Sequence, residues 1–163
     1  MSIGLWVRGA RPKTLVTSIA SVMVGAVMAY VHIERSGTCI EIYPEPASCA
    51  TAREQQTLLM DRFWPVTILC LLVALFLQIA VNYANDYSDG IRGTDAGRDT
   101  DESKSGKPQR LTASGLVPAK HVLFAAMICA AIACICGVVA VVLAQAWWLL
   151  AVGVALRRGP GVI

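Results

Sequence analysis

The sequence of 163 residues has few charged side chains, and its last 61 residues have no acidic ones. Asp, Glu, Lys and Arg together make up 15% of the chain, whereas soluble domains average about 25%. No Asp or Glu follows Glu102. Hydrophobic residues make up 56% of the chain, above the roughly 45–50% of soluble domains. These values exclude an ordinary soluble domain and are typical of an integral membrane protein.

The chain also lacks the motifs of several enzyme classes. It has no Gly-rich phosphate loop of the nucleotide-binding types, no nucleophile motif, no internal repeat and no cysteine spacing typical of zinc. His32 and His121 are single histidines at the edges of uncharged stretches, which favours interfacial over catalytic roles. We expect no nucleic-acid partner. Four of the six cysteines lie in uncharged stretches, where buried cysteine behaves as a small apolar residue: Cys70, Cys129, Cys134 and Cys136.

Three uncharged stretches are each about long enough to cross a bilayer, which takes about 20 apolar residues. They predict spans at about 14–32, 63–83 and 122–144. The basic start at 1–13 leaves a cleaved signal peptide as an alternative for the first stretch, but the stretch is long for a signal and has no clear cleavage site. The predicted fold is therefore all-α, a polytopic transmembrane helical bundle, forming a single membrane domain over 1–163.

A fourth span is predicted to be incomplete. Residues 122–156 are 35 residues without a charge, too many for one span and too few for two with a turn. A partial span at 146–156 would cover about half of the hydrocarbon core at roughly 1.5 Å per residue. It would leave Arg157 and Arg158 near the middle of the bilayer, which costs about 3 kcal/mol or more per charge. We therefore expect a C-terminally truncated fragment or a frame-shifted product.

The distribution of Lys and Arg predicts the orientation. Three bases lie in the leader at 1–13, three in the polar segment at 33–62, and six in the segment at 84–121. Cytoplasmic loops carry the excess of bases, and two spans return the chain to its starting side. We therefore predict an outer loop at 33–62, a cytoplasmic loop at 84–121 and a cytoplasmic N-terminus in the cell membrane. Cys39 and Cys49 lie in the predicted outer loop and are candidates for a disulfide.

Asn82, Asn85, Asp86 and Asp89 lie where the second uncharged stretch meets the polar loop. At about 100° per residue they share one helix face, where two carboxylates repel each other. A divalent cation removes that repulsion, and Mg²⁺ often takes one or two carboxylates together with water and substrate phosphate. The alternative is a solvated helix end that Gly90 terminates. We predict that this face binds Mg²⁺ through Asp86 and Asp89.

An acidic site at a membrane surface, followed by a basic loop, suits a substrate that is anionic at one end and apolar at the other. A polyprenyl diphosphate is such a molecule. Asp86 and Asp89 would hold Mg²⁺ against the diphosphate, and Arg92 would offset charge on the leaving group. The resulting allylic cation would be attacked by a nucleophilic aromatic ring, with the helices excluding water. For Arg98, Lys104 and Lys120, a role in membrane orientation alone is an equal alternative.

The stretch NDYSDGIRGTD at 85–95 resembles the first Asp-rich motif of the UbiA-type intramembrane prenyltransferases. Two flanking stretches, GARPKTL at 9–15 and RLTASG at 110–115, are similar to the branch that acts on 1,4-dihydroxy-2-naphthoate in menaquinone synthesis. The similarity covers about 6–156 but skips 33–62, which is longer than that branch leads us to expect.

The resemblance implies an all-helical fold of nine spans around a cavity that opens to the membrane. It implies transfer of a polyprenyl chain to dihydroxynaphthoate, releasing diphosphate and CO₂ and giving demethylmenaquinone. The catalytic residues it implies are Asn85, Asp86 and Asp89, and the Mg²⁺ ligands Asp86, Asp89 and Asp95. Its implied substrate-binding residues are Arg11, Lys13, Arg92 and Arg110. Asn82, on the same helix face as the acids, is a further predicted substrate-binding residue.

The chain also departs from the family pattern. The family has a second Asp-rich motif in its later half, which carries the second metal position, and this sequence has no such motif. We therefore expect the 163-residue chain to be inactive by itself. Two other possibilities remain open: a UbiA-type enzyme for hydroxybenzoate, homogentisate or haem, and a non-enzymatic channel or transporter subunit whose acids select cations. A CDP-alcohol phosphatidyltransferase fits poorly, because Asp89-Gly90 is followed by Ile91-Arg92. The oligomeric state stays open.

Overall fold

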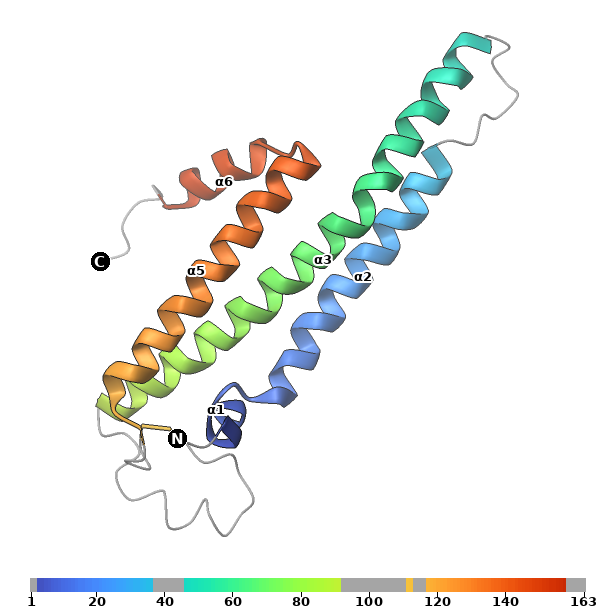
Figure 1. Cartoon of the computed structure of the whole chain (residues 1–163). Helices are drawn as coiled ribbons and strands as arrows, with labels where there is room; N and C mark the ends of the chain where they lie inside the picture. Colours follow the sequence, from blue (N-terminus) through green and yellow to red (C-terminus); the bar gives the residue numbers. More distant parts are fainter. Residues whose placement is uncertain (1–2, 37–45, 92–110, 113–116, 158–163) are drawn as a thin grey trace. The chain divides into compact units, whose positions relative to one another are not determined.

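Helices account for the regular structure that the computed structural model describes, which covers 3–36, 46–91, 111–112 and 117–157. The prediction of an all-α protein is confirmed over these residues. The helices are drawn in Figure 1 and have these bounds: α1 Ile3–Gly9, α2 Pro12–Ser36, α3 Pro46–Ile91, α5 Ala119–Ala144 and α6 Trp148–Arg157.

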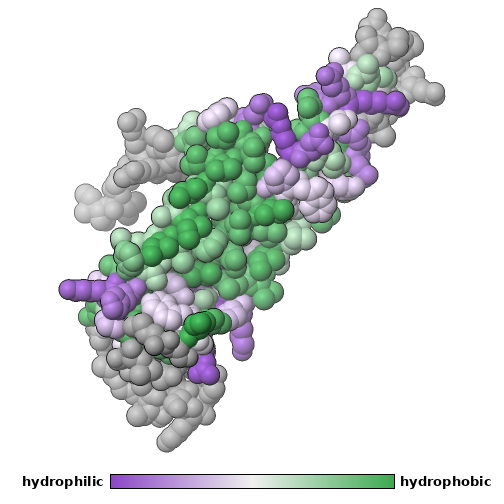
Figure 2. All heavy atoms as spheres, viewed as in Figure 1, coloured by the Kyte–Doolittle hydropathy of each residue, from purple (hydrophilic) through white to green (hydrophobic). Residues whose placement is uncertain are grey.

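Three of the helices, α2, α3 and α5, are long and apolar enough to cross a membrane. Their outward side chains are largely apolar, and on α2 they include Val16, Met23 and Val27. On the face shown in Figure 2, apolar side chains cover most of the surface of these helices. An apolar outer surface matches a hydrocarbon surrounding rather than water. Helix α6 has 10 residues, about half the length that a bilayer core requires.

Helix α3 is longer than the sequence analysis predicted. It contains 46 residues, about 69 Å at 1.5 Å per residue, more than twice the roughly 30 Å of a hydrocarbon core. Much of the predicted outer loop at 33–62 is helical: α2 continues to Ser36, and the chain is helical again from Pro46. That this segment lies on the outer side stays a prediction. At its other end α3 continues past the predicted span end at 83 to Ile91, so 82–89 belong to its last turns.

The chain divides into two compact units, and α2, α3 and α5 contribute residues to both. Unit 1 contains 1–21 and 72–135, and unit 2 contains 22–71 and 136–163. The core of unit 1 joins residues from α3, α5 and the segments that follow α1 and precede α5: Ala10, Tyr83, Leu111, Val117, Val122 and Ala126. Leu5 and Trp6 of α1 pack against this core. Leu111 and Val122 are 0% exposed, so the short segment 111–112 is anchored in this core.

In unit 2, the end of α2 packs against the first half of α3. The rings of Tyr30 and Phe63 meet edge to face with centroids 5.6 Å apart. The Gln56 side-chain amide donates a hydrogen bond of 3.1 Å to the Glu34 carbonyl. Cys49 is disulfide-bonded, whereas its proposed partner Cys39 lies outside the described residues. The polar first part of α3 is therefore tied to α2 by both apolar and polar contacts.

Candidate functional site

The four-residue face predicted on α3 is divided by burial. Asn82 and Asp86 are each 3% exposed, whereas Asn85 is exposed and Asp89 is half-buried. Two of the predicted site residues therefore face the interior of unit 1, and two are accessible from outside. Helical spacing alone does not distinguish these two pairs.

Asn82 joins α3 to the turn between α1 and α2. Its side-chain Nδ2 donates to the Ala10 carbonyl at 2.8 Å and to Thr14 Oγ1 at 3.0 Å. Its Oδ1 accepts a longer bond, 3.5 Å, from Gln78 Nε2. The role of Asn82 in substrate binding stays a prediction, and its amide donor is already used inside the protein. Sequence reasoning missed this contact, which spans 72 residues of chain.

The turn that Asn82 holds carries one predicted substrate-binding residue, Arg11, and a second one, Lys13, lies in the first turn of α2. Arg11 has a left-handed backbone with φ of 52°, an uncommon conformation for a non-glycine residue. Its carbonyl accepts hydrogen bonds of 2.9 Å from both the backbone N–H and the Oγ1 of Thr14. Arg11 is half-buried and Lys13 is exposed. The backbone at Arg11 is thus fixed in a strained conformation, two residues before the exposed side chain of Lys13.

Tyr83, the residue after Asn82, makes a second connection between α3 and α1. Its hydroxyl donates to the Trp6 carbonyl at 3.0 Å, and the two rings meet edge to face with centroids 5.6 Å apart. Asn82 and Tyr83 therefore hold α1 and the start of α2 against the last turns of α3.

Asp86 binds a segment from the far side of the polar loop. Its Oδ2 accepts hydrogen bonds from the backbone N–H of Leu111 at 2.9 Å and of Thr112 at 3.4 Å. The Thr112 hydroxyl donates to the Asp86 carbonyl. Hydrogen bonds to an ionised carboxylate are stronger than those between two neutral groups. They therefore hold the segment 111–112 strongly against α3. The helical pattern that identified Asp86 does not predict these hydrogen bonds to Leu111 and Thr112.

The acidic residues of this face determine whether it can hold a divalent cation. The described residues contain no group of three His, Cys, Asp or Glu side chains placed to hold a metal. They do contain Asp86 and Asp89, nearly one turn apart on α3. Mg²⁺ often uses only one or two carboxylates and completes its shell with water and phosphate, so this pair is compatible with it. Three further predicted site residues lie outside the described residues: Arg92, Asp95 and Arg110.

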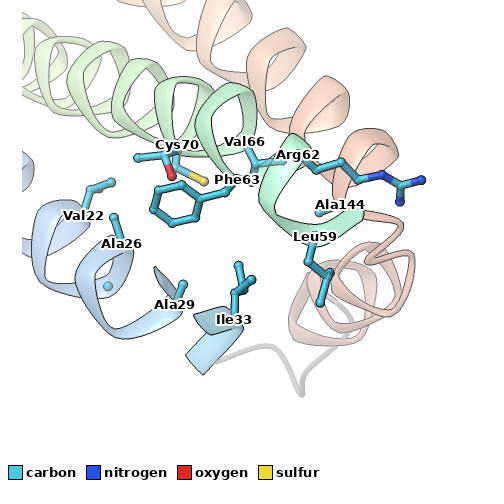
Figure 3. Close-up of a pocket in the computed structure, with 12 residues that line it drawn as sticks. Val22, Ala26, Ala29, Ile33, Leu59, Arg62, Phe63, Val66, Cys70 and Ala144 are labelled. Atoms are coloured by element: carbon cyan, nitrogen blue, oxygen red, sulfur yellow. The ribbon is translucent and has the colours of Figure 1, made fainter. Parts of the chain in front are cut away.

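Unit 2 contains a separate apolar cavity of about 460 Å³, shown in Figure 3. It is lined mainly by small and aliphatic side chains of α2 and α3, such as Ala26 and Ala29, together with the ring of Phe63. The Arg62 side chain extends away from them. A Cβ added at Gly25 would meet no other atom within 4 Å. The volume lies in the range of about 300–1,000 Å³ that small-molecule pockets occupy, and the lining suits an apolar chain.

Comparison with known proteins identifies relatives with a common description. The family model for the UbiA prenyltransferase family matches residues 58–157. The 1,4-dihydroxy-2-naphthoate octaprenyltransferase of Mycobacterium tuberculosis is 38% identical over 153 residues, which are 93% of this chain and 40% of that protein. The protein of the same description from Mycobacterium leprae is 34% identical over 158 residues, or 97% of this chain and 42% of that protein.

A third protein with that description, from Haemophilus influenzae, is 30% identical over 117 residues, 72% of this chain and 28% of that protein. The chain therefore spans about two fifths of the length of the mycobacterial relatives. No solved structure matches it significantly. The matched region 58–157 contains Asn82, Asn85, Asp86 and Asp89, and it covers most of the chain. This protein belongs to the UbiA prenyltransferase family.

Proposed function

We propose that this chain is part of an Mg²⁺-dependent prenyltransferase that transfers a polyprenyl chain from its diphosphate to 1,4-dihydroxy-2-naphthoate. Release of diphosphate and CO₂ would give demethylmenaquinone. The observation that carries the proposal is the pair Asp86 and Asp89 on the last turns of a helix long and apolar enough to cross a membrane. The descriptions of the three relatives support the aromatic acceptor.

The proposed roles follow from the chemistry of the side chains. Asp86, Asp89 and Asn85 hold the diphosphate through Mg²⁺, with Asp95 as a further ligand. When bound, the cation neutralises charge that develops on the leaving diphosphate. Asn85 is exposed and Asp89 half-buried, so both are accessible to a ligand that arrives from outside unit 1.

The cations have a complementary role. Arg11 lies on the turn and Lys13 in the first turn of α2, and Asn82 fastens this part of the chain to α3 through Ala10 and Thr14. Arg92 and Arg110 belong to the connection after α3 and would bind phosphate oxygens. Positive side chains fixed around a leaving diphosphate stabilise the transition state without reorganising during the reaction.

The proposed location is the cell membrane, with the N-terminus and the acidic face on the cytoplasmic side. Mg²⁺ and phosphorylated metabolites are available there, and the bases of 84–121 favour this side. The lipid bilayer would supply the apolar donor.

The test is calorimetric titration of the 163-residue chain in detergent with geranyl diphosphate, with and without Mg²⁺. We expect Mg²⁺-dependent binding that Asp89→Asn weakens about tenfold or more, the scale of one lost charge-assisted interaction. Gln55→Ala, at an exposed position in the first part of α3, serves as the control and should bind normally. Unchanged binding in the double variant Asp86→Asn, Asp89→Asn would overturn the proposal. Cation flux through liposomes with no diphosphate binding would favour the channel alternative instead.

A further inference from the structure

The segment Leu111–Thr112 lies between the end of α1 and the end of α3. We call these two residues the clip. Leu111 is 0% exposed. A Cβ added at Gly9 would collide with the Leu111 side chain, so α1 approaches the clip as closely as glycine permits. A Cβ added at Gly90 would lie 2.5 Å from Thr112 Cβ. Both helices therefore present a glycine to the clip, and it fits tightly between them.

The hydrogen bonds of the clip converge on one residue. Two backbone N–H groups of the clip donate to Oδ2 of Asp86, and the Thr112 hydroxyl donates to the carbonyl of the same residue. A carboxylate that is held at one oxygen by two amides cannot rotate freely about its side-chain torsions. The clip thus fixes both the backbone and the carboxylate of Asp86.

We infer that the clip positions the Asp86 carboxylate for its ligand, with Thr112 and Gly90 as positioning residues. The inference rests on the proposed function, in which Asp86 holds Mg²⁺ and the diphosphate. Side chains that are held in place before a ligand arrives bind it without the entropy loss of ordering them.

The inference predicts that damage to the clip weakens diphosphate binding although no clip side chain binds it. Thr112→Val keeps the size of the side chain but removes the hydroxyl that donates to the Asp86 carbonyl. Gly90→Ala pushes Thr112 away from α3. We expect each to weaken Mg²⁺-dependent binding of geranyl diphosphate by about three- to tenfold, the scale of one hydrogen bond. Thr112→Ser retains the hydroxyl and should bind within about twofold of the unmodified chain.

The experiment measures binding and clip order on the same samples. Calorimetry gives the affinity for geranyl diphosphate, and amide hydrogen exchange of the peptide that contains the clip gives its order. Thr57→Val, at an exposed position of α3 in unit 2, is the matched control: it removes a hydroxyl that donates to the Arg53 carbonyl within the helix and should change neither quantity. Addition of Mg²⁺ and geranyl diphosphate should slow exchange of the clip amides in the unmodified chain and not in Asp89→Asn.

The outcomes separate this inference from the proposed function. If Asp89→Asn loses binding while Thr112→Val binds normally despite faster amide exchange, the clip has only a structural role and the inference is overturned. If the double variant of Asp86 and Asp89 binds normally, the proposed function fails and the inference fails with it. Weakened binding in Thr112→Val and Gly90→Ala, with recovery in Thr112→Ser, supports the inference.

Discussion

Asn82 and Asn85 lie about one turn apart on α3, but their surroundings differ. Asn82 is 3% exposed and donates to Ala10 and Thr14, whereas Asn85 is exposed. Removing a buried donor leaves its acceptors without a partner, which costs about 1–3 kcal/mol. We therefore expect Asn82→Ala to lower the free energy of unfolding by that amount, measured by denaturation of the chain in detergent micelles.

Asn85→Ala is the matched comparison for this prediction. Because its side chain is exposed, we expect its unfolding free energy to change by less than about 0.5 kcal/mol, while binding of geranyl diphosphate weakens. The two asparagines would then affect different properties, stability for Asn82 and ligand binding for Asn85. Equal losses of stability in both variants would contradict the division by burial.

Replacing glycine by alanine is expected to have opposite effects on stability at Gly9 and at Gly25. A Cβ at Gly9 would collide with Leu111, which is wholly buried and has no room to move. We expect Gly9→Ala to destabilise unit 1 by about 1–3 kcal/mol, as overpacking does. A Cβ at Gly25 would meet nothing within 4 Å, and alanine favours a helix over glycine by about 0.5–1 kcal/mol. Gly25→Ala should therefore raise the melting temperature, and a fall would contradict the open surroundings of Gly25.

The sequence identified the polar face of α3 but not the contacts of its members. Spacing along one helix places Asn82, Asn85, Asp86 and Asp89 on one side of the axis. It does not say which segment covers that side. The partners of Asn82 lie 68 and 72 residues away, and those of Asp86 lie 25 and 26 residues away. Such contacts depend on how turns return the chain, which local periodicity does not encode.

At the scale of whole elements, the bounds of α3 were the least predictable feature. Residues 46–62 are polar, and this polarity was the reason for predicting a loop there. Ala, Arg, Glu, Gln, Leu and Met dominate the stretch 50–62, and all of them favour helices. Charge ends a membrane span, but it does not end a helix. Pro46 begins α3, where the absence of its N–H costs nothing.

The polar first part of α3 gives a test of orientation. Cys49 is disulfide-bonded, whereas Cys70, Cys129, Cys134 and Cys136 are free and lie in helices that can cross the membrane. Disulfides persist on the oxidising side of a membrane. We therefore expect a membrane-impermeant maleimide to label Cys49 in intact cells only after reduction, detected as a mass shift of its peptide.

Ser88→Cys provides the opposite control, because it lies on the last turns of α3. It should react with the same reagent only after the cells are permeabilised. Labelling of Ser88→Cys in intact cells, with Cys49 protected, would show that the orientation predicted from the Lys and Arg counts is reversed.

At the scale of the whole molecule, the described helices leave much apolar surface uncovered. Ile68 and Leu77 of α3, and Phe124 and Ile135 of α5, are each about half exposed or more. In a bilayer, such surfaces meet either lipid or further transmembrane helices, and both are apolar. The mycobacterial relatives are about two and a half times as long as this chain's matched region.

The last prediction concerns the activity of the 163 residues taken by themselves. The family resemblance implies nine spans and a second Asp-rich motif, whereas the described part of the chain has three helices able to cross a membrane. One metal site can bind a diphosphate. The family resemblance implies that neutralising the charge on a departing diphosphate needs both Asp-rich motifs. We therefore expect the 163-residue chain to bind geranyl diphosphate and to make no demethylmenaquinone in a host that lacks this activity.

Co-expression with the unmatched part of the Mycobacterium tuberculosis relative should restore product, measured by chromatography of extracted quinones. The same co-expression with Asp86→Asn and Asp89→Asn in this chain should give none, because both halves contribute acids to the proposed site. Product from the 163-residue chain alone would mean that a single Asp-rich face suffices for transfer. The need for two metal positions would then have to be abandoned for this protein, while the assignment of Asp86 and Asp89 would become stronger.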